Sequence, residues 1–249
     1  MNAQRWLQGK VVAQRRWTST LFSLQVDADL PPFDAGQFTK LALEIDGELV
    51  ARPYSFVNAP GCTPHEFYCA IVPGGPLSPR LALLSDGDAI LLAPAPAGFL
   101  VLSEVPDADT LWLLATGTGV GPFLSILGGD VVWQRFQKVV LVYAARRVED
   151  LAYGDWLTAI QAARGAQLRV VRMLSREVAP GFLQGRIPQA IDEGALERVT
   201  GVALQAATAQ VMLCGNPGMV ADATAALRQR GMKKHRRRDP GQITVENYW

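Results

Sequence analysis

The 249-residue chain has few cysteines, only two histidines and almost no net charge. Cys62, Cys69 and Cys214 are an odd number of cysteines in no metal-like spacing, which disfavours both a disulfide framework and a zinc knuckle. His65 and His235 lie far apart, with no other metal ligands in a recognisable pattern. We therefore predict a protein that binds no metal and resides in a reducing cytoplasm.

Long hydrophobic runs are scarce as well. The first ten residues contain no apolar segment of the kind that a secretory signal requires. The uncharged stretch 110–129 is long enough for a membrane span, but glycines and Pro122 interrupt it, so we expect a buried strand, a loop and a helix there. Neither a membrane nor nucleic acid is expected as a partner, because the formal net charge is only +1.

The small net charge hides an asymmetry between the two halves of the chain. Up to Ala108 there are 7 basic and 11 acidic residues, a net charge of −4, and after it there are 17 and 12, a net charge of +5. The second half is therefore the one expected to bind anions. With 49% apolar and 19% charged residues, the whole chain has the composition of a globular protein, and its length fits one large domain or two small ones.

The first half is rich in short β-type segments. Asp46-Gly47 stands between two of them in the position of a hairpin turn, and consecutive strands without long crossovers favour an antiparallel sheet closed as a small barrel. One helix is predicted, at residues 77–84. The six predicted strands are residues 11–17, 21–28, 37–45, 48–59, 66–72 and 89–95.

The second half alternates apolar runs with amphipathic segments, which is typical of a doubly wound parallel sheet. We predict two domains, the barrel at residues 1–101 and the α/β domain at residues 102–249. Ligands of such sheets bind beyond the carboxyl ends of the strands, so the loops after the strands should carry the chemistry. Strands are predicted at 111–115, 139–145, 168–174 and 211–215, and helices at 122–127, 150–164, 186–196 and 219–230.

A glycine-rich turn follows the first of the parallel strands. Gly117, Gly119 and Gly121 let the backbone approach an anion, and Pro122 fits the first turn of a helix whose free N–H groups would face that anion. The spacing G-x-G-x-G differs from the dinucleotide fingerprint G-x-G-x-x-G. Pyrophosphate binding and a turn required only for close packing are both consistent with it.

Three arginines stand at the ends of the other parallel strands. Arg146 and Arg176 each follow a predicted strand, and Arg186 begins the next helix. Each alone is explained as a solvated side chain. Together they favour the 2′-phosphate of NADP, which guanidinium groups bind by charge-assisted contacts.

The barrel half contains a second candidate anion site. Arg52 and Tyr54 stand in an otherwise small or apolar strand, and Ser78 begins the predicted helix. Arg52 and the helix N–H groups suit a pyrophosphate, and the Tyr54 ring offers a flat surface for an aromatic cofactor. Core packing of Tyr54, with Arg52 on the outer face, is the alternative.

In this order and spacing the motifs resemble the ferredoxin–NADP reductase family, and within it the short bacterial ferredoxin/flavodoxin–NADP reductases that end in an aromatic pair. The resemblance covers nearly the whole chain and rests on RPYS, GGPLS, ATGTGVGP, AAR followed by DL, SRE, GRIP, CGNPGM and ENYW. It implies that the barrel binds FAD, that the α/β domain binds NADP(H), that the aromatic tail returns to the FAD, and that the protein is a monomer.

The resemblance also implies roles for individual residues. Tyr54 and Tyr248 would cover the two faces of the flavin ring, and Lys often stands in relatives where this chain has Pro76. The implied FAD-binding residues are Arg52, Pro53, Tyr54, Ser55, Tyr68, Pro76, Leu77, Ser78, Thr118, Tyr248 and Trp249. The implied NADP-binding residues are Ala145, Arg146, Ser175, Arg176, Arg186, Gly215, Asn216 and Pro217. The residues implied to act at the reacting atoms are Tyr54, Ser55, Cys214, Glu246 and Tyr248.

The function so implied is that of an FAD-dependent oxidoreductase. It would exchange a hydride between NADPH C4 and flavin N5 and pass single electrons to or from ferredoxin or flavodoxin. The basic run 233–238 is then either a solvated loop or a docking patch for the acidic carrier. The alternatives are a reductase component serving an oxygenase or a haem protein, and a regulator that binds FAD or NADP without turnover.

Overall fold

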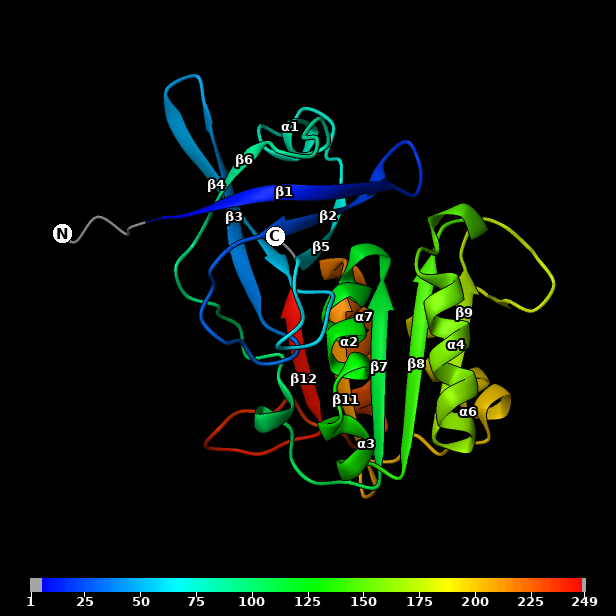
Figure 1. Ribbon diagram of the computed structural model, residues 1–249. Helices are drawn as coiled ribbons and strands as arrows, with labels where there is room; N and C mark the ends of the chain where they lie inside the picture. Colours follow the sequence, from blue (N-terminus) through cyan, green and yellow to red (C-terminus); the bar gives the residue numbers. More distant parts are fainter. Residues whose placement is uncertain (1–5, 248–249) are drawn as a thin grey trace.

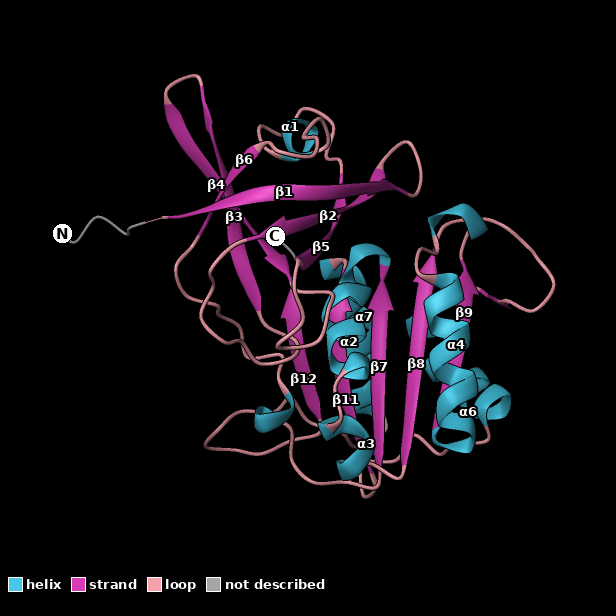
Figure 2. Ribbon diagram, viewed as in Figure 1, coloured by secondary structure: helices cyan, strands magenta, loops and turns pink. Residues whose placement is uncertain are grey.

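The computed structural model describes residues 6–247, so Tyr248 and Trp249 lie outside the described residues. The first half forms one six-stranded sheet in the order β4-β3-β6-β1-β2-β5, and every neighbouring pair in it is antiparallel (Figures 1 and 2). The strands are β1 (Leu7–Arg16), β2 (Leu21–Asp27), β3 (Phe38–Ile45), β4 (Glu48–Ser55), β5 (His65–Ala70) and β6 (Ala89–Leu92). All six strands predicted for this half are present.

The two edges of this sheet approach each other. Phe56, just after β4, forms an antiparallel bridge with Phe67 of β5, and Val57 N–H donates to Glu66 O at 2.9 Å. The sheet therefore curves as a barrel does, around a core that includes Phe56 and Phe67. The predicted hairpin turn between β3 and β4 is confirmed, because Asp46 and Gly47 both have positive φ, 53° and 82°.

Helix α1 (Ser78–Leu81) is shorter than the predicted 77–84. After Leu81 the N–H groups of Leu83 and Leu84 bond to carbonyls three residues back, so the chain tightens into turns and the helix ends.

The second half forms a parallel six-stranded sheet in the order β10-β9-β8-β7-β11-β12. Successive residues of β7 face opposite sides, with Leu113 in one hydrophobic cluster and Leu114 in the other. Helices α2, α3 and α4 cover the first face and α5, α6 and α7 the second, which confirms the doubly wound sheet. The strands are β7 (Thr110–Thr116), β8 (Lys138–Ala145), β9 (Leu168–Leu174), β10 (Leu183–Gln184), β11 (Ala209–Gly215) and β12 (Ile243–Asn247). The helices are α2 (Gly121–Gly128), α3 (Val131–Arg135), α4 (Gly154–Arg164), α5 (Ile187–Asp192), α6 (Ala195–Thr200) and α7 (Pro217–Gln229).

Several boundaries differ from those predicted. The helix expected over 150–164 begins only at Gly154, because Tyr153 adopts a left-handed backbone with φ of 61°. The helix expected over 186–196 is divided into α5 and α6 by Gly194, whose φ is 67°. Helix α3 and strands β10 and β12 were not predicted. They are short, and β10 and β12 are the two edge strands of the sheet.

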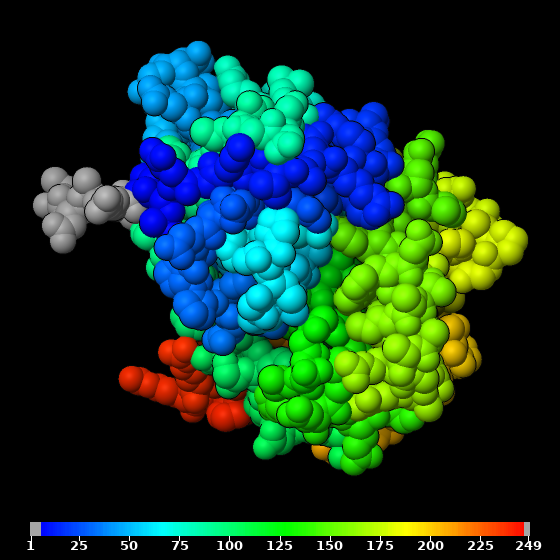
Figure 3. Space-filling view, viewed as in Figure 1, coloured from blue at the N-terminus to red at the C-terminus, as the bar shows by residue number. Residues whose placement is uncertain are grey.

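The two halves share one hydrophobic cluster. Leu21, Val57 and Tyr68 of the first half are buried together with the residues that α2 packs against β7. Figure 3 shows the blue and cyan atoms of the first half in broad contact with the green atoms of the second. The predicted boundary at residue 101 falls in the segment that links β6 to β7. Among residues 6–247, no helix is long and apolar enough to cross a bilayer.

Candidate active site

The carboxyl ends of the parallel strands point toward the antiparallel sheet (Figure 1). There the loop after β7 interlocks with the loop after β11. A Cβ on Gly119 would lie 2.6 Å from Cys214 O, and a Cβ on Gly215 would lie 2.2 Å from Thr116 Oγ1. Asn216 N–H donates to Thr116 Oγ1 at 3.0 Å. Close packing therefore explains Gly119.

Gly117 is different from Gly119. Its φ is +55°, and a Cβ built on it would meet nothing within 4 Å. The short 3-10 turn η2 (Gly117–Val120), which includes Thr118, therefore has open space beside its first residue. Pro122 stands in the first turn of α2, as predicted.

The glycine turn meets the strand that carries Arg52-Pro53-Tyr54-Ser55. Val57, two residues beyond β4, places its Cγ2 atom 3.6 Å from the Cβ position of Gly121. The structure thus brings the two motifs from different halves of the chain to one place, although the sequence separates them by about sixty residues.

Within β4 the motif residues differ in exposure. Arg52 is exposed and its Nη1 donates to Ala51 O at 2.7 Å, whereas Ser55 is buried. Tyr54 is partly buried, and this burial raises the pKa of its hydroxyl well above the ordinary value. Tyr54 therefore stays neutral at physiological pH and presents an uncharged ring and hydroxyl.

Glu246 lies beside Cys214. The two residues are register partners in β12 and β11, and Cys214 is fully buried. Burial raises the pKa of Glu246 to about 7, and its Oε2 atom is buried with no hydrogen-bond partner among residues 6–247. Strand β12, which the sequence did not predict, sets Glu246 at this position.

The Glu246 carboxylate also reaches the first half of the chain. A Cβ on Gly98 would lie 3.1 Å from Glu246 Oε1 and 3.1 Å from the ring of Phe38. Phe38 in turn pairs with Ser55 across β3 and β4. Cys214 and Glu246 therefore share one strand pair, and Gly98 and Phe38 connect this pair to the strand that carries Tyr54 and Ser55.

The GGPLS turn, residues 74–78, contains the second candidate anion site, and part of it is buried. Ser78 is buried, and its Oγ accepts a 2.9 Å hydrogen bond from Val72 N–H, so this oxygen holds the turn together. Leu77 is buried and Pro76 is exposed. An anion here would depend on backbone N–H groups more than on the Ser78 oxygen.

Tyr68 lies in the interface between the two halves. It is 5% exposed, and its ring meets that of Tyr153 edge-on at a centroid distance of 5.3 Å. Tyr153 donates to Glu66 Oε1 at 2.6 Å, and its hydroxyl lies 2.6 Å from Ser23 Oγ. Trp17 Nε1 donates to the same Ser23 oxygen at 2.8 Å. This polar cluster could not be predicted from sequence, because its members lie up to 136 residues apart.

The segments predicted to bind the adenosine end of NADP lie side by side. Ala145 O accepts from Ser175 N–H at 3.0 Å and from Ser175 Oγ at 3.2 Å, and Arg146 O accepts from Arg176 N–H at 3.0 Å. Arg186 is the N-cap residue of α5, as expected, and follows Gly185, whose N–H donates to Leu174 O. The three predicted arginines thus project from adjoining segments at the ends of β8, β9 and β10.

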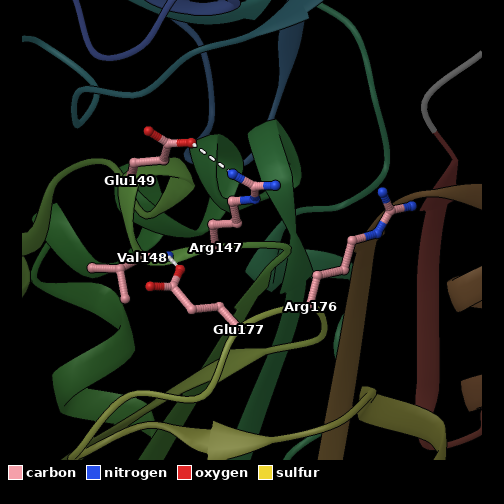
Figure 4. Close-up of a pocket in the computed structure, with 5 residues that line it drawn as sticks. All are labelled: Arg147, Val148, Glu149, Arg176 and Glu177. Atoms are coloured by element: carbon pink, nitrogen blue, oxygen red, sulfur yellow. Dashed lines mark hydrogen bonds and ion pairs between the residues drawn. The ribbon is translucent and has the colours of Figure 1, made fainter.

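A pocket at this edge contains one arginine that sequence reasoning missed. Figure 4 shows Arg147 and Arg176 pointing the same way from neighbouring loops, with Glu149 and Glu177 close by. The pocket is lined by Arg147, Val148, Glu149, Arg176 and Glu177, so Arg147 and not Arg146 shares it with Arg176. Adjacent arginines cannot be told apart from sequence, because the backbone of the loop decides which one faces the pocket.

Asn216 caps helix α7. Its Oδ1 atom accepts hydrogen bonds from Gly218 N–H at 2.9 Å and Met219 N–H at 3.3 Å, and Pro217 has no N–H to offer. The contribution of Asn216 to a nucleotide site is thus to fix this turn beside Cys214 and Gly215.

The basic run 233–238 lies at the other end of β12. The run precedes Ile243, the first residue of the strand, whereas Glu246 lies near its end. The strand rises about 10 Å from Ile243 to Glu246. Arg237 pairs with Glu104 at 2.5 Å and Lys233 pairs with Asp239. Part of the positive charge is therefore neutralised within the chain.

Comparison with known proteins accounts for this arrangement. Residues 113–225 match the family model of the oxidoreductase NAD-binding domain. The chain is 51% identical to a flavodoxin/ferredoxin–NADP reductase of Shigella flexneri and 50% identical to one of Escherichia coli strain K12, in each case over 98% of this chain and 99% of the relative. The chain belongs to the flavodoxin/ferredoxin–NADP reductase family. This confirms the resemblance inferred from the sequence motifs.

A solved member of this reductase family has the same fold. The ferredoxin NADP+ reductase of Neisseria gonorrhoeae, described with bound FAD and NADP, is 32% identical to this chain, with a TM-score of 0.94 and complete coverage of both chains. The sites described above suit the same two groups on chemical grounds. Arg147 and Arg176 together suit a phosphate, and the Glu246 Oε2 atom, which has no hydrogen-bond partner in the part of the chain that the structure describes, lies where the two halves meet.

Proposed function

We propose that this reductase-family protein uses FAD to transfer electrons between NADP(H) and ferredoxin or flavodoxin. The relatives from Shigella flexneri and Escherichia coli are named flavodoxin/ferredoxin–NADP reductases, and the Neisseria gonorrhoeae structure contains both FAD and NADP. The observation that carries the proposal is the meeting of the two motifs, in which Val57, after the Arg52–Ser55 strand, lies beside the glycine turn, with its Cγ2 atom 3.6 Å from the position that a Cβ on Gly121 would take.

In the proposed reaction the bound FAD supplies the chemistry that joins a two-electron donor to one-electron partners. The chain holds and orients the reactants. Tyr54 offers a neutral ring, and Arg52 with the backbone of Leu77 and Ser78 would bind the FAD phosphates. Thr118 lies on the glycine turn, on the side of the site formed by the second half.

The nicotinamide end is assigned to the carboxyl ends of β11 and β12. Cys214 is fully buried there, and Glu246 beside it has a pKa of about 7, so near neutral pH its carboxyl is present in both protonation states. A protonated carboxyl can donate one hydrogen bond and a carboxylate only accepts. Glu246 is therefore suited to hold or release a proton next to a polar ligand group.

The adenosine end is assigned to the ends of β8, β9 and β10, where Ala145, Arg146, Ser175, Arg176 and Arg186 adjoin one another. Charge-assisted bonds from guanidinium groups favour a 2′-phosphate over a 2′-hydroxyl. This supports NADP(H) as the preferred dinucleotide.

The experiment is direct. Purified protein should be yellow with one FAD per chain, and it should reduce an artificial one-electron acceptor far faster with NADPH than with NADH. It should also reduce a ferredoxin or flavodoxin of the same cell. A colourless protein that cannot be reconstituted with FAD would contradict the proposal, and binding of both cofactors without turnover would favour the regulator instead.

A further inference from the structure

The pocket at the ends of β8 and β9 is lined by an arginine, Arg147, that is not among the residues that the sequence motifs assign to the NADP site. Arg147 and Arg176 line it together (Figure 4). They come from the loops after the neighbouring parallel strands β8 and β9, so both side chains face the pocket at the carboxyl ends of these strands.

The backbone that carries Arg147 is fixed by two carboxylates. Arg147 N–H donates to Asp150 Oδ2 at 3.2 Å, and Val148 N–H donates to Glu177 Oε2 at 2.8 Å. These two consecutive N–H groups are already engaged within the chain. An anion in the pocket would therefore be recognised by the arginine side chains, and the fixed backbone sets the direction of the Arg147 side chain.

The present partner of Arg147 is weak. Its Nη1 lies 4.0 Å from Glu149 Oε1, and both side chains are about two-thirds exposed. Ion pairs of this kind contribute little because solvent screens them. A phosphate accepts two parallel hydrogen bonds from one guanidinium group, so it competes well with such a partner.

We propose that Arg147 is a specificity-determining residue of the NADP site. It binds the 2′-phosphate of the adenosine together with Arg176, and Glu149 is the partner that it leaves when the nucleotide binds. This inference rests on the proposed function, because it assumes that the pocket receives the adenosine end of NADP(H).

The test measures nucleotide binding by calorimetry on the FAD-containing protein, with adenosine 2′-monophosphate and adenosine 5′-monophosphate as probes. We expect Arg147→Gln to weaken binding of the 2′-phosphate about tenfold, the usual effect of losing one charge-assisted interaction, and to change binding of the 5′-phosphate by less than about twofold. Glu149→Gln should tighten binding of the 2′-phosphate, because it releases the Arg147 side chain from its ion pair. The gain in affinity should therefore be smaller when Glu149→Gln is introduced into the Arg147→Gln protein.

Arg164→Gln is the matched control. Arg164 is the last residue of α4, in the same domain, and it pairs with Asp130 at 3.8 Å, so the control removes the same charge away from the pocket. The inference is overturned if Arg147→Gln binds the 2′-phosphate as tightly as the wild type does, or if Arg164→Gln weakens binding as much as Arg147→Gln does. It is also overturned if Glu149→Gln tightens binding equally in the presence and in the absence of Arg147. If the variants do not behave as expected but the wild-type protein still prefers NADPH over NADH, the inference about Arg147 is wrong and the proposed function stands. If the wild-type protein does not distinguish the two phosphates, the NADP assignment fails with the inference.

Discussion

The Tyr153 hydroxyl donates a 2.6 Å hydrogen bond to Glu66 Oε1, which joins the loop before α4 to the edge strand β5 of the antiparallel sheet. The same hydroxyl lies 2.6 Å from Ser23 Oγ on β2. Burial, and then the neighbouring Glu66 carboxylate, raise the pKa of Tyr153 well above its ordinary value. The contact therefore persists across the physiological pH range and fixes the two halves relative to each other.

Tyr153→Phe keeps the ring and removes the hydroxyl that bonds to Glu66. We expect it to lower the free energy of unfolding by about 1–3 kcal/mol, because Glu66 and Ser23 lose a buried partner. Chemical denaturation measures this change. Tyr54→Phe is the control, since Tyr54 is only partly buried and its hydroxyl makes no hydrogen bond within residues 6–247. A larger loss in the control than in Tyr153→Phe would contradict the role given to Tyr153.

Gly119→Ala should destabilise the loops at the ends of β7 and β11. The added Cβ would lie 2.6 Å from Cys214 O, a backbone atom that cannot move away alone, and the expected loss is about 1–3 kcal/mol with reduced flavin reduction by NADPH. Gly154→Ala is the control, because a Cβ there meets nothing within 4 Å at the start of α4. The prediction is wrong if Gly119→Ala melts at the wild-type temperature with full activity.

Glu246 should give the protein a pH-dependent stability. Its pKa rises from an ordinary 4.5 to about 7 through burial, so the folded state takes up a proton that the unfolded state does not hold in that interval. This contribution is complete below about pH 4.5 and is lost as pH rises to about 7. Relative to Glu246→Gln, we expect the wild type to lose about 1–3 kcal/mol between about pH 5 and pH 8, measured by denaturant unfolding. Parallel pH profiles for the two proteins would refute it.

The basic run 233–238 can be tested for carrier docking. Lys234, Arg236 and Arg238 are exposed and make no ion pair within 4.0 Å in the described part of the chain, unlike Lys233 and Arg237. If the run steers an acidic carrier, the triple Gln variant should lower kcat/KM for ferredoxin or flavodoxin about tenfold at low salt and leave a neutral artificial acceptor unaffected. An unchanged carrier rate would leave the run as a solvated loop.

The strands that pack in the two cores were predictable from sequence because their apolar runs are long and unbroken, as in β7 and β8. Strand β12 was missed because Ile243–Asn247 is short and half polar, and only its pairing with β11 makes it a strand. Because β12 was missed, the position of Glu246 beside Cys214 could not be predicted either.

The positions of Arg176 and of the glycine turn were predictable because each lies directly after one strand. A contact was not predictable where the spatial neighbour is distant in sequence, as for Tyr153 and Glu66, 87 residues apart. Nor does the sequence decide between Arg146 and Arg147, because the turn of the backbone after β8 selects the one that faces the pocket.

The shared cluster that buries Leu21, Val57 and Tyr68 against the second half has a consequence for how the molecule loses its structure. Separating the halves would expose these side chains to water at a cost proportional to their apolar area. Heating should therefore produce one cooperative transition instead of two, and a truncated chain that ends near residue 101 should be prone to aggregation.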